Sequence, residues 1–263
     1  MSVASVPFLR GVGLHTGEQV AARLLPAPEG AGLSVRRTDL GVELAVVQQN
    51  VRSRERCTCL EGGGACVETV EHALAALVGL GIADAVLEVD GPEVPQLDGS
   101  ALPWVLAARA ASLTSSPRRW RVERDLEIRD GARVLRLSPG AAVDVRSTVD
   151  FAHPAIGRSC LRWTGDPEDF ATRFAPARTF ALLEDVAALH GAGRIRGGTL
   201  DAAVVLGPAG PLNPEGLRFP DEPARHKLLD LLGDLALLGG APLGRVEAER
   251  YGHGMVARAA AGL

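Results

Sequence analysis

The chain has 263 residues, of which 46% are hydrophobic and 23% are charged, and its formal net charge is −4. This length and apolar content can bury a sizeable core, so the composition predicts a globular protein of one large or two small domains. The acidic balance argues against a nucleic-acid partner, and no segment has the ~20 apolar residues that span a bilayer. The N-terminus has no basic region followed by an apolar run, so we expect a cytoplasmic location.

The first half of the chain is predicted to hold short strands around one clear helix. Apolar residues recur at helical spacing over 69–80, and the glycines at 79 and 81 suit the end of that helix. A second helix is expected from about Pro103 to about Ala111. The strands are predicted at 20–25, 42–47 and 85–89.

A polar, serine-rich stretch at 112–117, followed by two arginines, is the best linker candidate. It predicts an N-terminal domain at 1–115 and a C-terminal domain at 118–263. The second half repeats the same order of elements, with strands predicted at 120–128, 134–137, 143–149 and 202–206 and then a long helix at 223–238. Asp221 is expected to cap that helix. The sequence thus predicts an α+β fold made of two duplicated domains.

The four cysteines lie at positions 57, 59, 66 and 160. They are too few and too unevenly spaced for a disulfide scaffold, so we expect free thiols. A structural zinc site that uses Cys57, Cys59 and Cys66 is an alternative, although C-x-C lacks the paired C-x-x-C spacing of such sites.

Lys227 is the only lysine among the 28 basic residues, and it lies between His226 and Asp230. A chain that uses arginine almost everywhere else but keeps one lysine here indicates a need for a compact ammonium group. The alternative is chance placement on a solvated helix face.

On the 223–238 helix, His226, Asp230 and Asp234 recur every four residues and therefore share one stripe. A polar stripe on a helix with a broad apolar face is costly unless its members are paired or bind a ligand. His and Asp one turn apart can share a Zn²⁺ ion. An ordinary solvated pair is the alternative.

Two further histidines are candidates for the same site. His72 follows Glu71 near the start of the 69–80 helix, where the positive end of the helix dipole favours a neutral, ligating imidazole. His253 lies between two glycines, which allow close backbone approach and could present one imidazole into a cleft as a general acid. Ordinary helix-start and turn residues are the alternatives.

The chain resembles the bacterial UDP-3-O-acyl-N-acetylglucosamine deacetylases, which are the zinc amidases of lipid A biosynthesis. The resemblance covers nearly all 263 residues. It rests on motifs that occur in the family's order: GVGLHTG (11–17), RRTDL (36–40), CTCL (57–60), TVEH (69–72), PEVP (92–95), LDGS (97–100), DFAHP (150–154), ARTF (177–180), LRF (217–219), RHKLLD (225–230), GD (233–234) and GH (252–253).

The resemblance implies a zinc site, with iron as an alternative metal in the cell, held by His72, His226 and Asp230. Glu71 matches the general base that activates water for attack on the acetamide. The implied fold has two α+β domains whose helices are sandwiched between two sheets, with the active site at the domain junction.

Two further pairs of residues match the family's catalytic groups. His253 matches a cationic histidine in a general acid or electrostatic role, held by Asp234. Thr179 and Lys227 match groups near the scissile carbonyl and its oxyanion.

The implied substrate is a UDP-linked acylated amino sugar. Phe180 matches an aromatic side chain that lines the sugar site, and Asp150 and Phe151 match the contacts to uracil. Arg250 stands where the family often has a basic residue near the diphosphate, and Cys57 is expected among the substrate-binding residues.

The family also carries an inserted strand-helix-strand unit, expected here near 180–206, that forms an apolar passage for the substrate's acyl chain. Arg194 and Arg196 lie in a part of the unit that is apolar in many relatives. Either the passage is shorter, or the two arginines snorkel outward and bury only their stems. We therefore predict a different acyl-length preference from that of relatives with an apolar passage.

Two other functions are weighed against the deacetylase. A non-catalytic binding module of similar fold would need the basic, aromatic-studded surface that this acidic chain lacks. A zinc hydrolase of another N-acyl sugar differs only in its substrate. We expect a monomer with no nucleic-acid partner.

Overall fold

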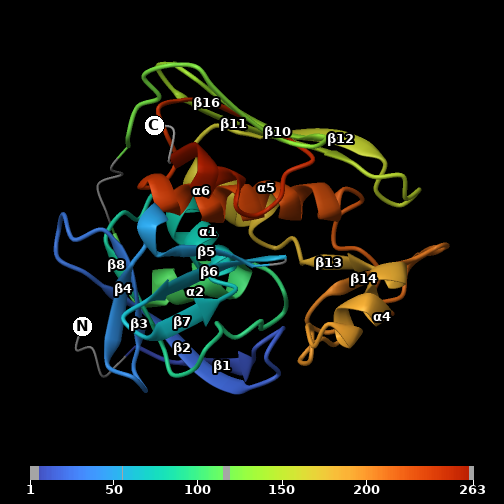
Figure 1. The fold of residues 1–263 in the computed structure, drawn as a ribbon, viewed down its shortest axis with the longest axis horizontal. Coiled ribbons are helices and arrows are strands. Elements are labelled where there is room, and N and C mark those ends of the chain that lie inside the picture. Colours follow the sequence, from blue (N-terminus) through green and yellow to red (C-terminus); the bar gives the residue numbers. More distant parts are fainter. Residues whose placement is uncertain (1–5, 55, 115–118, 261–263) are drawn as a thin grey trace.

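The computed structural model describes residues 6–54, 56–114 and 119–260. It has an α+β fold in which helices lie between two five-stranded sheets (Figure 1). Among the described residues, no helix is both long and apolar enough to cross a membrane.

The first half contains one large sheet, one small sheet and two helices. The large sheet has β1 (Leu9–Val12), β2 (Gln19–Pro26), β3 (Leu33–Arg37), β4 (Val42–Ala45) and β8 (Ala85–Val89). The small sheet has β5 (Val51–Arg54), β6 (Cys57–Gly62) and β7 (Ala65–Glu68). The helices are α1 (Glu71–Gly79) and α2 (Leu102–Ala110).

The second half has the same plan. Its large sheet has β9 (Leu126–Asp130), β10 (Arg133–Ser138), β11 (Val143–Asp150), β12 (Arg158–Trp163) and β16 (Gly244–Glu249). Its small sheet has β13 (Phe180–Leu182), β14 (Val204–Gly207) and β15 (Gly210–Pro211). Its helices are α3 (Pro167–Asp169), α4 (Leu183–Gly191), α5 (Glu222–Leu235) and α6 (Met255–Ala260).

The two large sheets have the same topology. The first runs β1-β2-β8-β3-β4, and the second, read from its other edge, runs β9-β10-β16-β11-β12. Among the described strands of each sheet, one pair is parallel, and it joins the central strand to the third strand of its half, β8 to β3 and β16 to β11. Matching strand order with matching direction is the pattern expected of a duplicated α+β unit.

The hydrophobic core lies between the sheets and is filled by α1, α2 and α5. Every residue of α1 is buried, and the leucines at 228, 229, 231, 232 and 235 of α5 are at most 1% exposed. Figure 1 shows α5 and α6 beneath the second large sheet, with α1 and α2 on their other side. Burial on this scale makes any polar side chain on α1 or α5 conspicuous.

The structure corrects two of the predicted elements. The strand predicted at 120–128 begins only at Leu126, because the exposed charged run 123–125 separates β9 from the buried Val122. Asp221 precedes α5 as predicted, but its carboxylate accepts a hydrogen bond from Arg225 Nε (2.7 Å) instead of capping the helix.

The other boundaries differ by a few residues. The 69–80 helix starts at Glu71, because Thr69 adopts a left-handed φ of 61°. In the predicted linker, residues 115–118 lie outside the described part of the chain, so the domain boundary stays a prediction.

Candidate active site

The site begins where α1 and α5 cross. Gly233 on α5 lies against the backbone of Glu71, and a Cβ added to it would lie 2.1 Å from the Glu71 carbonyl oxygen. Only glycine allows this approach. The crossing brings the first turn of α1 alongside the polar stripe of α5.

Three buried side chains from the two helices converge at this crossing. Asp230 Oδ1 lies 3.2 Å from His226 Nε2 and 3.7 Å from His72 Nε2. The two imidazole rings meet edge to face, with centroids 4.9 Å apart. One ligand atom from each of the three side chains lies within 4.8 Å of the others. Two imidazole nitrogens and a carboxylate oxygen are a ligand set typical of catalytic zinc.

The protonation of these groups suits a divalent cation. His226 Nδ1 lies 3.1 Å from the Ala177 carbonyl, so its N–H donates there and Nε2 is the ring nitrogen that faces Asp230. Burial and the neighbouring His226 lower the pKa of His72 to about 3, which keeps its imidazole neutral. Burial opposes ionisation of Asp230, but His226 and Lys227 outweigh it and hold that pKa well below its usual range.

One buried carboxylate oxygen of the cluster fits a bound cation. Asp230 Oδ1 is buried and has no hydrogen-bond partner among the described residues, while Oδ2 accepts from Lys227 Nζ at 2.8 Å. A buried carboxylate oxygen without a partner is costly. A cation between Asp230 and the two histidines would satisfy it.

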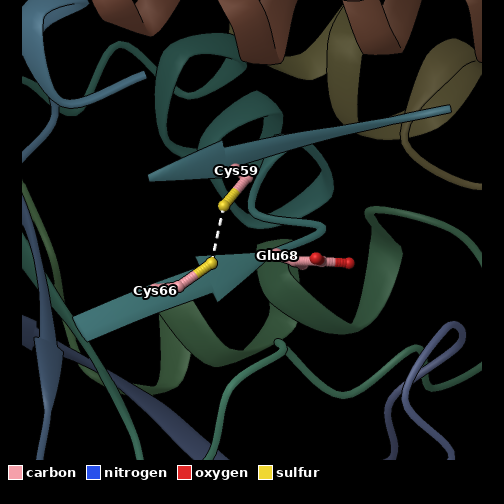
Figure 2. A group of neighbouring side chains, drawn as sticks. All are labelled: Cys59, Cys66 and Glu68. Carbon is pink, nitrogen blue, oxygen red and sulfur yellow. Dashed lines mark hydrogen bonds between the residues drawn. The ribbon is translucent and has the colours of Figure 1, made fainter. Parts of the chain in front are cut away.

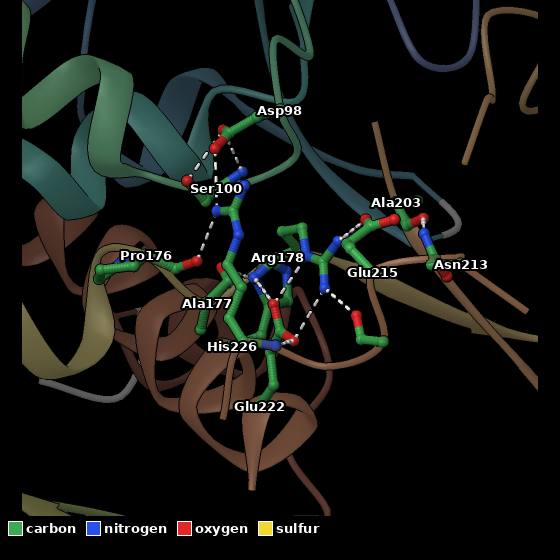
Figure 3. Close-up of polar contacts among 12 residues, drawn as sticks. Asp98, Ser100, Pro176, Ala177, Arg178, Ala203, Asn213, Glu215, Glu222 and His226 are labelled. Atoms are coloured by element: carbon green, nitrogen blue, oxygen red, sulfur yellow. Dashed lines mark hydrogen bonds and ion pairs between the residues drawn. The ribbon is translucent and has the colours of Figure 1, made fainter. Parts of the chain in front are cut away.

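A buried ion pair holds the segment that orients His226 (Figure 3). Arg178 is 2% exposed, and its backbone N–H and Nε each donate to Glu222 Oε1 at 2.9 Å. Its NH1 group also donates to Glu215. Arg178 directly follows Ala177, so this network fixes the carbonyl that accepts from His226.

Glu71 faces the same cluster from the first turn of α1. Its Oε2 accepts the backbone N–H of Thr58 on β6 at 3.0 Å, and the side chain is almost fully buried. Burial, opposed by the charge of His253 and reinforced by Asp234, raises the pKa of Glu71 to about 8. A carboxylate with a pKa near neutrality is suited to accept and release a proton.

His253 is paired with Asp234. Its Nδ1 lies 3.0 Å from Asp234 Oδ2, an oxygen that also accepts from the Tyr251 hydroxyl at 2.5 Å. The hydroxyl of Thr58 donates to the other Asp234 oxygen. Burial lowers the pKa of His253, but Asp234 outweighs it and raises the pKa to about 9. The contact with Asp234 therefore favours the cationic form of the His253 imidazole.

A cavity of about 1170 Å³ opens over these residues. Lys227, Thr179 and Phe180 line it, and the Lys227 ammonium lies 5.8 Å from the centre of the Phe180 ring. Apolar side chains of the 180–206 unit extend the cavity, among them Leu182, Val186, Leu189, Ile195 and Leu200. The strand-helix-strand order of that unit agrees with the sequence prediction.

Of the predicted uracil and diphosphate contacts, the structure places one in the cavity wall. Phe151 lines the cavity and packs edge to face on Phe180, with ring centroids 5.7 Å apart. Asp150 accepts from Arg250 at 2.8 Å and from Arg158 at 3.1 Å. Neither Asp150 nor Arg250 is among the described residues that line the cavity.

The remaining candidates lie apart from the metal ligands. Arg194 donates to Glu68 Oε2 at 2.8 Å and to Cys57 Sγ at 3.2 Å, and burial raises the pKa of the Cys57 thiol. The Arg196 backbone N–H donates to the His15 carbonyl at 3.4 Å. None of these three predicted residues is among the described cavity-lining residues, so the cavity takes its apolar lining from other side chains of the unit, beside the polar Asp185 and His190.

The sequence analysis missed three residues that organise the site: Thr58, Tyr251 and Arg178. Thr58 lies inside the CTCL motif, which pointed to its region without giving it a role. Tyr251 is the only tyrosine of the chain and lies two residues before His253. Their partners are distant in sequence, so only the fold reveals the contacts.

Comparison with known proteins gives consistent matches. The family model described as UDP-3-O-acyl N-acetylglycosamine deacetylase matches residues 2–263. A protein named UDP-3-O-acyl-N-acetylglucosamine deacetylase from Anaeromyxobacter dehalogenans is 44% identical over 257 residues, covering 97% of this chain and 83% of the relative. Proteins of the same name from Myxococcus xanthus (40% identical; 97% and 82% covered) and a Nostoc species (41%; 93% and 91%) also match.

Proposed function

The chain belongs to the UDP-3-O-acyl N-acetylglycosamine deacetylase family, and we propose that three of its side chains bind zinc while Glu71 and His253 move the protons of the hydrolysis. The enzyme removes the acetyl group from the nitrogen of UDP-3-O-acyl-N-acetylglucosamine in lipid A biosynthesis. This activity excludes a non-catalytic binding module.

His72, His226 and Asp230 are the proposed zinc ligands. The observation that carries this proposal is the unpartnered Asp230 Oδ1 between two imidazole nitrogens at 3.2 and 3.7 Å. Zinc held by these residues would supply Lewis-acid polarisation of the amide carbonyl and would make a water molecule more acidic. Nitrogen and oxygen ligands also accept Fe²⁺, so the metal used in the cell depends on supply as well as affinity.

Glu71 accepts the proton of the attacking water. The Thr58 N–H holds one carboxylate oxygen at 3.0 Å and leaves the other for the proton. Burial raises the pKa of Glu71 to about 8, which makes it a stronger base than an exposed glutamate.

His253 donates a proton to the departing amine nitrogen, or stabilises the charge that develops there. Its Nδ1 is engaged by Asp234 at 3.0 Å, which leaves Nε2 as the donor. Asp234 and Tyr251 do not reach the substrate in this scheme and act as positioning residues. On the other side of the site, Thr179 and Lys227 stabilise the carbonyl oxygen as it gains negative charge.

Phe180 and Phe151 form the aromatic wall for the sugar and the base, and the apolar part of the cavity takes the acyl chain. Asp150 is the proposed contact to uracil and Arg250 the proposed contact to the diphosphate. The two side chains form an ion pair with each other, which the substrate would have to open or to contact as a unit. Cys57, Arg194 and Arg196 support the passage wall from behind.

We further propose that the chain acts as a monomer in the cytoplasm, with domains at 1–115 and 118–263. The three proposed ligands lie on α1 and α5 of the same chain, so the proposed metal site needs no second copy. The four cysteines are too few and too unevenly spaced for the disulfide scaffold of a secreted protein, which supports a reducing compartment. The matching strand order of the two large sheets supports the two domains.

The test measures zinc content and acetate release from the UDP-sugar for the unaltered enzyme, Glu71→Gln and His226→Ala. The unaltered enzyme should hold one tightly bound zinc per chain. Glu71→Gln should keep that zinc and lose roughly 10²-fold or more in kcat, whereas His226→Ala should lose the zinc. Full activity of Glu71→Gln, or zinc retained by His226→Ala, would refute these assignments.

A further inference from the structure

A pair of cysteine thiols lies in the small sheet of the first half (β5, β6 and β7), apart from the proposed zinc ligands. Cys59 on β6 and Cys66 on β7 project toward one another from neighbouring antiparallel strands (Figure 2). Their sulfur atoms are 2.7 Å apart. That separation is about 0.7 Å longer than the ~2.05 Å of a disulfide bond.

The strand register explains why the two side chains meet. Cys59 pairs with Glu68, and Glu61 pairs with Cys66, so the two cysteines are diagonal neighbours on one face of the hairpin. Both side chains therefore leave the hairpin on the same side, and they turn toward each other across the diagonal (Figure 2).

A metal ion fits this pair less well than a covalent bond does. Cys59, Cys66 and Glu68 have three possible ligand atoms within 4.8 Å of one another. Two thiolates on a tetrahedral zinc with Zn–S distances of ~2.3 Å are ~3.8 Å apart, so the sulfurs would have to separate by about 1 Å. Arg194 also donates to Glu68 Oε2 at 2.8 Å, and a metal would have to displace that bond.

The two thiols differ in exposure. Cys59 is fully buried, whereas Cys66 is partly exposed. Thiol–disulfide exchange needs one thiol that a soluble reagent can reach and a second that can attack the resulting mixed disulfide. This pair provides both, with the buried sulfur in contact with the accessible one.

We propose that Cys59 and Cys66 form a reversible disulfide when the chain meets a low-molecular-weight disulfide oxidant. The Cys66 thiolate attacks one sulfur of oxidised glutathione, which forms a mixed disulfide and releases one glutathione thiol. The Cys59 thiolate then attacks Cys66 Sγ, which forms the protein disulfide and releases the second glutathione. Two protein thiols are oxidised, one glutathione disulfide is reduced, and the released thiolates take up the two protons.

The bond would join the two strands that hold the catalytic base. Thr58, next to Cys59, donates its backbone N–H to Glu71, and β7 leads directly into the first turn of α1. A disulfide here closes a short loop and reduces the freedom of the unfolded hairpin. We expect oxidation to raise the melting temperature by roughly 5 °C for a chain of this size.

The test incubates the full-length protein in glutathione buffers of increasing oxidised fraction, blocks remaining thiols by alkylation under denaturing conditions, and maps the peptides by mass spectrometry. Metal content and melting temperature are measured on the same samples. Cys66→Ser removes the pair, and Cys160→Ser is the matched control because Cys160 is exposed on β12.

We expect a peptide linking Cys59 to Cys66, with the loss of two hydrogens, in the unaltered protein and in Cys160→Ser but not in Cys66→Ser. The rise in melting temperature should follow the same pattern. Alkylation of both Cys59 and Cys66 after full oxidation, a glutathione adduct that persists on Cys66, or one zinc per chain lost specifically in Cys66→Ser would each overturn the proposal.

Discussion

Asp234 Oδ2 lies 3.0 Å from His253 Nδ1, and it also accepts the Tyr251 hydroxyl at 2.5 Å. Asp234 thus supplies the negative charge that keeps the buried imidazole of His253 cationic and also fixes its orientation. Removing that charge while keeping the shape of the side chain tests both effects.

For Asp234→Asn we expect kcat to fall by roughly 10²-fold, because the neutral amide no longer stabilises the imidazolium that serves the leaving nitrogen. KM and zinc content should stay close to those of the unaltered enzyme, since Asp234 is not a proposed ligand. Steady-state kinetics and metal analysis measure these quantities. An unchanged kcat would contradict the proposed role of the pair.

Lys227 donates to Asp230 Oδ2 at 2.8 Å from a side chain that is 21% exposed. We expect Lys227→Arg to lower kcat/KM by about tenfold, because the planar guanidinium cannot place a compact charge at both Asp230 and the carbonyl oxygen. Lys227→Ala should lower kcat/KM further, because it removes the positive charge altogether. Full activity of the arginine variant would show that the single lysine is not kept for its shape.

The polar stripe of α5 could be predicted, because burying His226, Asp230 and Asp234 on a leucine-rich helix is costly unless they are paired or bind a ligand. That α1 contributes to the same site could be predicted from Glu71 and His72 at its start. The Thr58 and Tyr251 contacts could not be, since Thr58 and Asp234 are 176 residues apart and meet only after two sheets have assembled. The position of the Arg194 guanidinium depends likewise on Glu68, which lies on a strand distant in sequence.

Strand boundaries were harder to predict than the helices. Strand β8 is fully buried and matches its predicted range of 85–89. The sequence analysis missed β12, because its exposed and partly buried residues show little apolar alternation, and it extended β9 into a charged run. The start and end of these strands depend on which residues pack against the helices beneath the sheet, and the local sequence says little about that packing.

Gly233 provides a test of the helix crossing that positions Glu71. In Gly233→Ala the added Cβ would meet the Glu71 carbonyl oxygen at 2.1 Å, so the helices must separate. We expect a loss of about 1–3 kcal/mol in the free energy of unfolding, with lower activity as well. Urea denaturation measures the first quantity. Gly191→Ala at the end of α4 is the control, because a Cβ there meets nothing within 4 Å. Equal stability of the two variants would argue against tight packing at the crossing.

The Arg178–Glu222 pair is expected to matter far more than a surface ion pair. Arg178→Ala removes the guanidinium that balances the charge of the fully buried Glu222 carboxylate, which should destabilise the fold by roughly 3–5 kcal/mol. Arg109→Ala removes an ion pair with Glu168, whose side chains are 46% and 73% exposed, and should cost about 1 kcal/mol or less. Urea unfolding of both variants provides the comparison. Similar losses would show that the buried network does not hold the 176–180 segment.

The buried position of His15 predicts how the stability of the fold depends on pH. The side chain is 3% exposed, and neither ring nitrogen has a hydrogen-bond partner among the described residues. Burial, with a smaller contribution from the charge of Arg194, lowers the pKa of His15 from 6.5 to about 4. Between these values the unfolded chain binds the proton more readily than the folded one. The contribution of His15 is therefore fully present above pH ~6.5 and declines as the pH falls toward about 4, by up to about 3 kcal/mol.

His15→Leu should remove this part of the pH dependence, because leucine cannot take up a proton in either state. Unfolding free energies measured by urea denaturation between pH ~4 and ~7 should fall less steeply with acidification in His15→Leu than in the unaltered protein. His190→Leu is the control, since His190 is exposed on α4 and its replacement should leave the slope unchanged. If the His15 variant keeps the full slope, other buried groups must account for the loss of stability in acid.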